Sequence, residues 1–240
     1  MNQHCNVDED EVARFDRVSQ LWWDPAGKMG MLHAINPLRS AFVMEPLAAI
    51  ARPRVVDVGC GGGILAEALA RAGMQAVGID QSTQSLEVAR RHALGQGLDI
   101  DYRIQTAEEL AACEPGRFDA VTCLEMLEHV PDPAAVIDAC ARLVRPGGHV
   151  FFSTINRTFK AWLFAIVGAE YVLRILPHGT HRYDRLIHPV QMRGWARHSG
   201  LQFVRSSSLM YNPFNRRWRI AHDREDVNYI AHFIRPAVAR

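Results

Sequence analysis

The sequence has few cysteines, and none of them is spaced as a metal-binding or redox pair. The five cysteines form no Cys-x-x-Cys motif, and the nearest two in the chain are Cys113 and Cys123. This scattered, odd-numbered set excludes a disulfide framework and the usual zinc-ligand spacings. The acidic segment 1–11 also lacks an apolar stretch, so a secretory signal is not expected. We therefore expect reduced thiols and a cytoplasmic protein.

The sequence also lacks an apolar run long enough to cross a membrane. Its most apolar stretch, residues 161–176, reads AWLFAIVGAEYVLRIL and is interrupted by Glu170 and Arg174. A spanning helix needs about 20 predominantly apolar residues, so this stretch is too short. The chain of 240 residues is nevertheless 48% hydrophobic, which excludes a disordered protein. We expect one domain over residues 1–240, with an N-terminal helical cap at 1–50 and an apolar, basic insertion at 156–188.

Acidic residues are scarce in one part of the chain. Residues 153–220 contain 11 Lys/Arg and only two acidic residues, whereas residues 1–152 contain 13 Lys/Arg and 21 Asp/Glu. The net charge of +1 therefore results from the cancellation of −8 and +9, because residues 221–240 are neutral. A basic segment of this kind calls for an anionic partner or a structural explanation.

Strand-like and helix-like segments alternate through the middle of the chain. This alternation predicts an α/β fold with a doubly wound, Rossmann-like, mostly parallel sheet of seven strands. The predicted strands are 54–58, 75–79, 100–104, 118–123, 149–153, 201–210 and 227–233. The predicted helices are 64–72, 85–94, 108–112, 134–144 and 189–198, with further N-terminal helices, one of them opening at Asn36-Pro37. Trp22 and Trp23 are expected to pack over the sheet or a ligand, because exposed tryptophan pairs are costly.

A glycine-rich turn follows the first predicted strand. Asp57, Gly59, Gly61 and Gly63 form an acidic-x-Gly-x-Gly-x-Gly pattern between that strand and a helix. Glycine allows close approach of a ligand to the backbone, and the helix start presents free N–H groups. Asp80, at the end of the second strand, is placed to accept hydrogen bonds from ribose hydroxyls. The pattern predicts a nucleotide-like cofactor.

Two cofactors compete for this turn. The acidic-x-Gly-x-Gly-x-Gly form resembles motif I of class I S-adenosylmethionine-dependent methyltransferases, and the carboxylate of Asp57 suits a cationic cofactor better than a pyrophosphate. A shifted frame, Gly-x-Gly-x-x-Ala from Gly61 to Ala66, leaves an NAD-dependent oxidoreductase as the alternative. A cofactor-binding subunit without catalysis is a further alternative.

The fourth predicted strand ends in a cluster of possible ligands. Glu125, Glu128 and His129 are spaced i, i+3 and i+4, so a single helical turn would place them on one face. Two carboxylates and an imidazole could hold a divalent cation such as Mg²⁺ or Zn²⁺. Without metal, His129 is the candidate general base, because its ordinary pKa lies near neutral pH. The absence here of an Asn/Asp-Pro-Pro-aromatic motif disfavours a nucleic-acid substrate.

Several motifs along the chain resemble the ubiquinone biosynthesis O-methyltransferases. The resemblance covers nearly the whole chain, and it rests on Arg14-Phe15, Trp22-Trp23-Asp24, His33, Asn36-Pro37-Leu38-Arg39, the segments 57–63 and 125–133, and Gly168-Ala169-Glu170-Tyr171. It implies O-methylation of a polyprenylated catechol and of 3-demethylubiquinol with S-adenosylmethionine as donor. It also implies cofactor contacts at Arg39, Gly59, Asp80 and Leu124, in addition to Gly61 of the glycine pattern, and divalent metal ligands at Glu125, Glu128 and His129. A methyltransferase acting on another small acceptor remains the alternative within this class.

The apolar, basic insertion has its own interpretation. Cationic residues flank the apolar stretch, a pattern that suits peripheral contact with an anionic membrane through residues 157–188. A substrate-pocket lid or a dimer contact is the alternative. A nucleic-acid surface is a third interpretation, and it is the weakest because few exposed aromatic residues besides Trp195 and Trp218 are expected among the basic ones. Under the first interpretation the chain is a cytoplasmic enzyme on the inner membrane, in reach of a polyprenyl substrate and of a possible biosynthetic complex.

Overall fold

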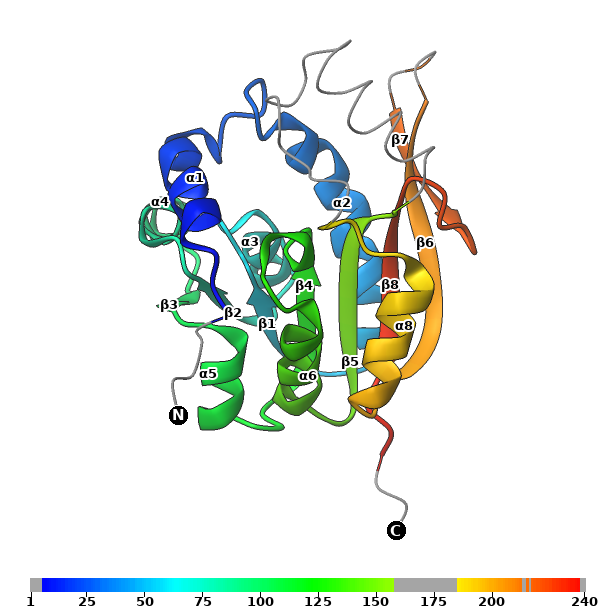
Figure 1. Ribbon diagram of the computed structural model, residues 1–240. Helices are drawn as coiled ribbons and strands as arrows, with labels where there is room; N and C mark the ends of the chain where they lie inside the picture. Colours follow the sequence, from blue (N-terminus) through cyan, green and yellow to red (C-terminus); the bar gives the residue numbers. More distant parts are fainter. Residues whose placement is uncertain (1–5, 158–184, 213–214, 216, 238–240) are drawn as a thin grey trace.

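The computed structural model describes residues 6–157, 185–212, 215 and 217–237. Most of the predicted insertion at 156–188 therefore lies outside the described residues. The described part forms an α/β structure with one eight-stranded sheet in the order β3-β2-β1-β4-β5-β8-β6-β7, which can be followed across Figure 1. The four pairings from β3 to β5 are parallel, and the three pairings from β5 through β8 and β6 to β7 are antiparallel.

The strands lie close to the predicted positions. Their bounds are β1 Arg54–Val58, β2 Gln75–Asp80, β3 Asp101–Ile104, β4 Phe118–Leu124, β5 Val144–Ile155, β6 Gln202–Asn212, β7 Arg217–His222 and β8 Asn228–Ile234. The predicted count of seven was wrong by one, because β7 was missed. This strand is at the edge of the sheet and its side chains are exposed or half-buried, so it carries no buried apolar run. Strand β7 is defined by its antiparallel pairing with β6.

The helices cover both faces of the sheet. Their bounds are α1 Glu9–Val18, α2 Gly30–Met44, α3 Ile64–Arg71, α4 Thr83–Gly95, α5 Ala107–Cys113, α6 Pro133–Leu143 and α8 Pro189–His198, with short 3-10 turns at Ser19–Leu21, Glu45–Leu47 and Leu127–His129. Buried side chains of α5, α6 and α8 form one core with the sheet, and those of α2, α3 and α4 pack on the opposite face (Figure 1). None of the helices in the described ranges is long and apolar enough to cross a bilayer.

One N-terminal helix begins earlier than expected. The Asn36-Pro37 pair does not open a helix, because α2 starts at Gly30 and contains Pro37 in its interior. A proline there removes one backbone hydrogen bond. The helix is retained because its buried face, which includes Ile35, Phe42 and Val43, packs against α3 and the sheet.

The sheet order creates the site. β1 lies between β2 and β4, so the chain leaves β1 toward one side of the sheet and later returns on the other. Ligands of open α/β sheets bind at this reversal, outside the carboxyl ends of the strands. The glycine turn after β1, Asp80 after β2 and the segment after β4 are thereby brought to one edge.

Candidate active site

The glycine turn has the backbone geometry that its sequence predicts. Gly59, Gly61 and Gly63 have φ values of 70°, 51° and 83°, in the left-handed region that favours glycine. A methyl group added at Gly59 would overlap the side chain of Met126, and one added at Gly61 would overlap the indole of Trp22. The turn is therefore closely covered and restricted to glycine by both conformation and space.

Asp80 holds the glycine turn in place. Its two carboxylate oxygens accept hydrogen bonds from the backbone N–H groups of Gly61 and Ser82, both at 2.8 Å. Burial raises the pKa of Asp80 above its usual value. Each carboxylate oxygen has a second lone pair, so acceptance of ribose hydroxyls remains compatible with these bonds. The carboxylate thus joins the carboxyl ends of β1 and β2.

A buried pair of opposite charges lies at the base of the site. Asp57 accepts a hydrogen bond from the Thr122 hydroxyl at 2.7 Å, and burial raises its pKa to about 7 although Arg39 acts in the opposite direction. Arg39 is only 5% exposed, and its Nε has no hydrogen-bond partner among the described residues. A buried guanidinium group with a free donor is suited to an anionic group of a ligand.

The two tryptophans pack on the glycine turn. Trp22 covers Gly61 and Gly62 and donates its indole N–H to the Ser85 hydroxyl at 2.9 Å. Trp23 donates to the carbonyl of Gly62 at 2.9 Å and stacks on His92 with ring centroids 3.5 Å apart. The sequence predicts that this pair packs over the sheet or a ligand; in the structure the surface that it covers is instead the glycine turn.

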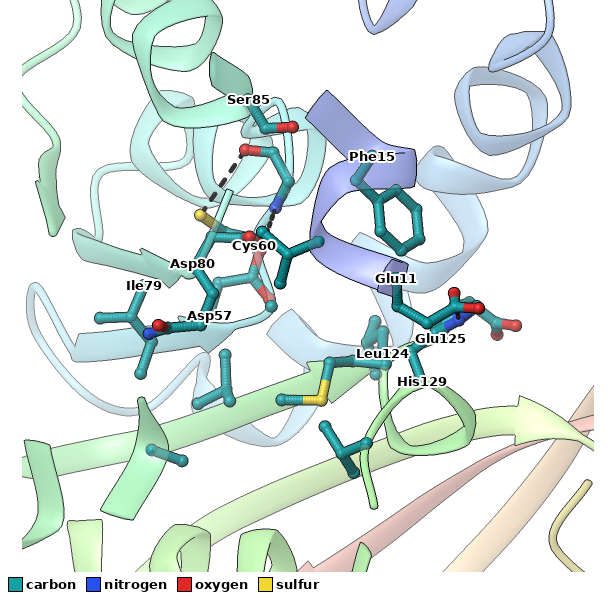
Figure 2. Close-up of a pocket in the computed structure, with 18 of the residues that line it drawn as sticks. Glu11, Phe15, Asp57, Cys60, Ile79, Asp80, Ser85, Leu124, Glu125 and His129 are labelled. Atoms are coloured by element: carbon teal, nitrogen blue, oxygen red, sulfur yellow. Dashed lines mark hydrogen bonds and ion pairs between the residues drawn. The ribbon is translucent and has the colours of Figure 1, made fainter. Parts of the chain in front are cut away.

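A cavity of about 270 Å³ opens between these elements. Figure 2 shows its wall, with Glu11 and Phe15 reaching toward it from α1, Asp57 and Asp80 from the strand ends, and His129 from the segment after β4. Seven of the eight site residues predicted from the sequence line it, namely Arg39, Gly59, Gly61, Asp80, Leu124, Glu125 and His129. Glu128 does not line the cavity, because it is 4% exposed and buried behind it.

The predicted helical turn through Glu125, Glu128 and His129 does not form. Glu125 has a φ of 54°, in the left-handed region, and the helical geometry is limited to a 3-10 turn at Leu127–His129. A non-glycine residue in this conformation interrupts a right-handed helix. The three side chains consequently point to different partners.

Each of the three predicted metal ligands is engaged separately. Glu125 accepts a hydrogen bond from the Ser153 hydroxyl at 2.7 Å, and Glu128 accepts one from the Thr154 hydroxyl at 2.9 Å. Within the ranges that the structure describes, no three acidic, histidine or cysteine side chains converge as a metal site. Glu128 retains one buried oxygen without a partner. As arranged, the three residues do not fit a shared divalent cation.

Burial and neighbouring charges shift the pKa of two groups in this segment. Burial raises the pKa of Glu128 to about 7, with a further contribution from the neighbouring Glu125 carboxylate. Burial alone would lower the pKa of His129, but the carboxylates of Glu11 and Glu128 outweigh it and the pKa is raised. The imidazole of His129 is therefore stabilised in its charged form by acidic neighbours.

Glu11 is a site residue that the sequence did not single out. It belongs to α1, and its carboxylate lies 2.8 Å from Nδ1 of His129, 118 residues further along the chain. Phe15, one turn later in α1, contacts the same imidazole edge-on at 5.1 Å between ring centroids. No local motif marks Glu11, because its neighbours in the chain, Glu9 and Asp10, are also acidic.

Known proteins share this architecture and sequence. A methyltransferase domain family matches residues 31–209. The ubiquinone biosynthesis O-methyltransferase of Alkalilimnicola ehrlichii is 53% identical over 228 residues, covering 95% of this chain and 92% of that protein. The protein of the same description from Ralstonia nicotianae is 52% identical, with 97% of each chain covered.

A solved structure supports the fold. Magnesium protoporphyrin IX methyltransferase from Synechocystis, with bound SAH, has a TM-score of 0.68 and 20% identity, covering 93% of this chain and 94% of that one. These relationships contradict the oxidoreductase alternative and the non-catalytic alternative, and they make this chain an S-adenosylmethionine-dependent O-methyltransferase. By its fold and by sequence identity of about half over nearly its full length, the chain belongs to the ubiquinone biosynthesis O-methyltransferase family.

Proposed function

We propose that the chain methylates a hydroxyl group of polyprenylated catechols, at two stages of ubiquinone biosynthesis. The first converts 2-polyprenyl-6-hydroxyphenol to 2-polyprenyl-6-methoxyphenol, and the second converts 3-demethylubiquinol to ubiquinol. The observation that carries this proposal is the 53% identity, over 95% of the chain, to a ubiquinone biosynthesis O-methyltransferase. The cavity at the carboxyl ends of the strands supplies the place for both reactants.

The cofactor contacts follow from the chemistry of the cavity wall. S-adenosylmethionine, when bound, supplies a methyl group on a positively charged sulfur. We assign its carboxylate to Arg39, whose guanidinium is buried with a free donor, and its ribose to Asp80. Gly59 and Gly61 allow close approach of the cofactor, and Leu124 provides an apolar contact. The acidic side chains of Glu11 and Glu125 also line the cavity and favour a cationic ligand.

His129 is the candidate base for the acceptor hydroxyl. A phenolic hydroxyl has an ordinary pKa of about 10, so it must lose its proton as the oxygen attacks the methyl carbon. Nε2 of a neutral His129 accepts that proton. The oxygen–carbon bond forms as the carbon–sulfur bond breaks with its electron pair moving to sulfur, and the imidazole later releases the proton to water. The apolar side chains of Phe15 and Leu124 border the same cavity and limit the access of water.

The metal implied by the resemblance is tested separately. Glu125, Glu128 and His129 make separate contacts with Ser153, Thr154 and Glu11, and the left-handed backbone at Glu125 prevents the helical turn that would bring them together. The proposed mechanism therefore uses no metal ion. Full turnover in excess EDTA is expected. Loss of turnover in EDTA, with recovery on added Mg²⁺ or Zn²⁺, would contradict His129 as the base. It would show instead that a metal ion assists ionisation of the acceptor hydroxyl.

The acceptor tail is the basis of a second part of the proposal. The segment 157–188, most of which lies outside the described residues, combines an apolar stretch with flanking cations. This pattern supports peripheral contact with anionic lipid, which would bring a cytoplasmic enzyme to a polyprenyl chain in the inner membrane and to a possible biosynthetic complex. Flotation with anionic but not with neutral liposomes is expected. Equal recovery with both would contradict the membrane assignment.

A product assay tests the reaction itself. The purified chain is incubated with S-adenosylmethionine and a short-chain polyprenyl catechol, and the expected product is heavier by one methylene, as measured by mass spectrometry. Calorimetry is expected to show binding of S-adenosylhomocysteine and no binding of NADH. Binding of S-adenosylhomocysteine without methylation of the catechol would contradict the proposed acceptor and favour another small acceptor.

A further inference from the structure

Helix α1 is fixed over the cavity by polar contacts with distant parts of the chain. Just before the helix, the Asn6 amide donates to Glu108 at 2.9 Å and to the carbonyl of Asp132 at 2.8 Å. Asp8, the N-cap of α1, forms an ion pair with Arg185 at 2.8 Å. At the other end, Asp16 accepts a hydrogen bond from the Ser82 hydroxyl at 2.6 Å. These contacts define the position of the helix relative to the strand ends.

The face of α1 toward the cavity carries one carboxylate in contact with the candidate base. Glu11 lies 2.8 Å from Nδ1 of His129, and its side chain is 19% exposed. Nε2 of His129 has no hydrogen-bond partner within the described residues, and His129 lines the cavity. Phe15 restrains the imidazole ring from its edge. The two ring nitrogens therefore have different surroundings, one paired with a carboxylate and one free for a ligand.

We propose that Glu11 is a positioning residue for the methyl transfer: its carboxylate holds Nδ1–H of His129 and so leaves Nε2 to accept the proton of the acceptor hydroxyl. This proposal rests on the proposed function, in which His129 is the base.

The physical reason lies in the tautomers of neutral histidine. In neutral histidine only one of the two ring nitrogens carries a proton. A hydrogen bond from one nitrogen to a fixed acceptor decides which nitrogen that is. A carboxylate accepts but does not donate, so Glu11 stabilises the tautomer with the proton on Nδ1. Glu11 additionally fixes the ring orientation, because the imidazole can rotate only by losing this hydrogen bond.

The test compares three variants of the full chain. One removes the charge of Glu11 but keeps its shape, one keeps the charge on a shorter side chain, and one removes a charge elsewhere on α1. Glu11→Gln is expected to lower kcat for the short-chain catechol by about 10- to 100-fold, because general-base catalysis depends on the protonation state and orientation of the base. KM and the affinity for S-adenosylhomocysteine are expected to change less than about twofold. Glu11→Asp keeps the carboxylate and should recover part of the loss. Glu9→Gln removes the same charge from an exposed position of α1 and serves as the control.

A double-mutant cycle separates positioning from general support of the fold. In a His129→Ala background, Glu11→Gln is expected to cause no further loss of kcat, because the residue on which it acts is absent. A multiplicative loss in that background, or an equal loss in Glu9→Gln, would overturn the proposal. So would a selective loss of affinity for S-adenosylhomocysteine, since that would identify Glu11 as a cofactor contact.

A spectroscopic measurement keeps this inference apart from the proposed function. The imidazole ¹⁵N shifts of His129, assigned by their absence in His129→Gln, report which ring nitrogen carries the proton. Glu11→Gln is expected to shift the tautomer population away from Nδ1–H, whereas Glu9→Gln is not. If the parent chain does not methylate the catechol, the proposed function fails while the tautomer measurement still tests the contact. Unchanged ¹⁵N shifts in Glu11→Gln would overturn the positioning role.

Discussion

The two sides of the cavity are built in different ways. The side formed by the glycine turn takes its backbone shape from seven consecutive residues, 57–63, in which Gly59, Gly61 and Gly63 adopt left-handed conformations. The side formed by the segment after β4 takes its shape from distant partners, because Ser153, Thr154 and Glu11 each hold one of its polar side chains. The first side is encoded locally, whereas the second exists only in the folded chain.

Each side also contains one buried carboxyl group with a raised pKa. Asp57 and Glu128 each accept a hydrogen bond from a threonine hydroxyl, and burial raises the pKa of each to about 7. Their charged neighbours differ. The charge of Arg39 acts on Asp57, whereas those of Glu125 and His129 act on Glu128. The buried carboxyl group on the glycine side therefore has a cation in its surroundings, and the one on the β4 side has a second carboxylate and an imidazole.

A large effect on both cofactor binding and stability is expected on the locally encoded side. Gly61→Ala should weaken binding of S-adenosylhomocysteine by at least about 100-fold and destabilise the chain by about 2 kcal/mol, because the new methyl group overlaps Trp22 and the φ of 51° is strained for alanine. Calorimetry and thermal unfolding measure the two effects. Gly95→Ala, in open space with an ordinary φ, is the matched control and should bind normally. Normal binding by Gly61→Ala would show that the turn does not contact the cofactor.

A large effect on turnover is expected on the other side of the cavity. His129→Ala should lower kcat by about 100- to 10,000-fold, the usual contribution of a general base. Binding of S-adenosylhomocysteine should change less than about twofold, because His129 is not among the proposed contacts of the cofactor. Single-turnover and binding measurements separate the two quantities. A parallel loss of binding and turnover would remove the distinction between the two sides.

A moderate effect on stability is expected from Glu128. Its pKa is raised from 4.5 to about 7 in the folded chain, so the folded state retains a proton that the unfolded state releases. Stability therefore falls as pH rises from about 4.5 to about 7. Glu128→Gln should remove the contribution of Glu128 to that decline, leaving that of Asp57, and stabilise the chain at pH 8 by about 1–2 kcal/mol, measured by urea unfolding across this pH range. A variant whose stability still declined as steeply would exclude Glu128 as the responsible group.

The smallest expected effect comes from the threonine that holds Glu128. Thr154→Val removes the hydroxyl that donates to Glu128 but keeps the shape of the side chain. We expect a loss of about 1 kcal/mol at neutral pH, because a buried carboxyl group loses a hydrogen bond. In the Glu128→Gln background the loss should differ, since the two residues are in direct contact. Equal losses in both backgrounds would show that the hydroxyl acts independently of Glu128.

The sequence by itself determined the features that depend on neighbouring residues. Strand β1 was predicted at Arg54–Val58 and helix α8 at Pro189–His198, with the observed bounds, because their apolar patterns and flanking residues are local. The glycine turn and the mostly parallel sheet followed from the same kind of pattern, and the motifs from Arg14 to Tyr171 identified the family.

Only the tertiary structure decided how the segment after β4 is arranged. The spacing of Glu125, Glu128 and His129 predicts a helical turn, but the left-handed backbone at Glu125 separates them. Glu11 could not be distinguished from the acidic residues beside it until the fold brought α1 next to His129. Strand β7 likewise depends on its pairing with β6. Local backbone preferences act between near neighbours and can be deduced from the sequence, whereas hydrogen bonds between residues 118 positions apart form only when packing brings them together.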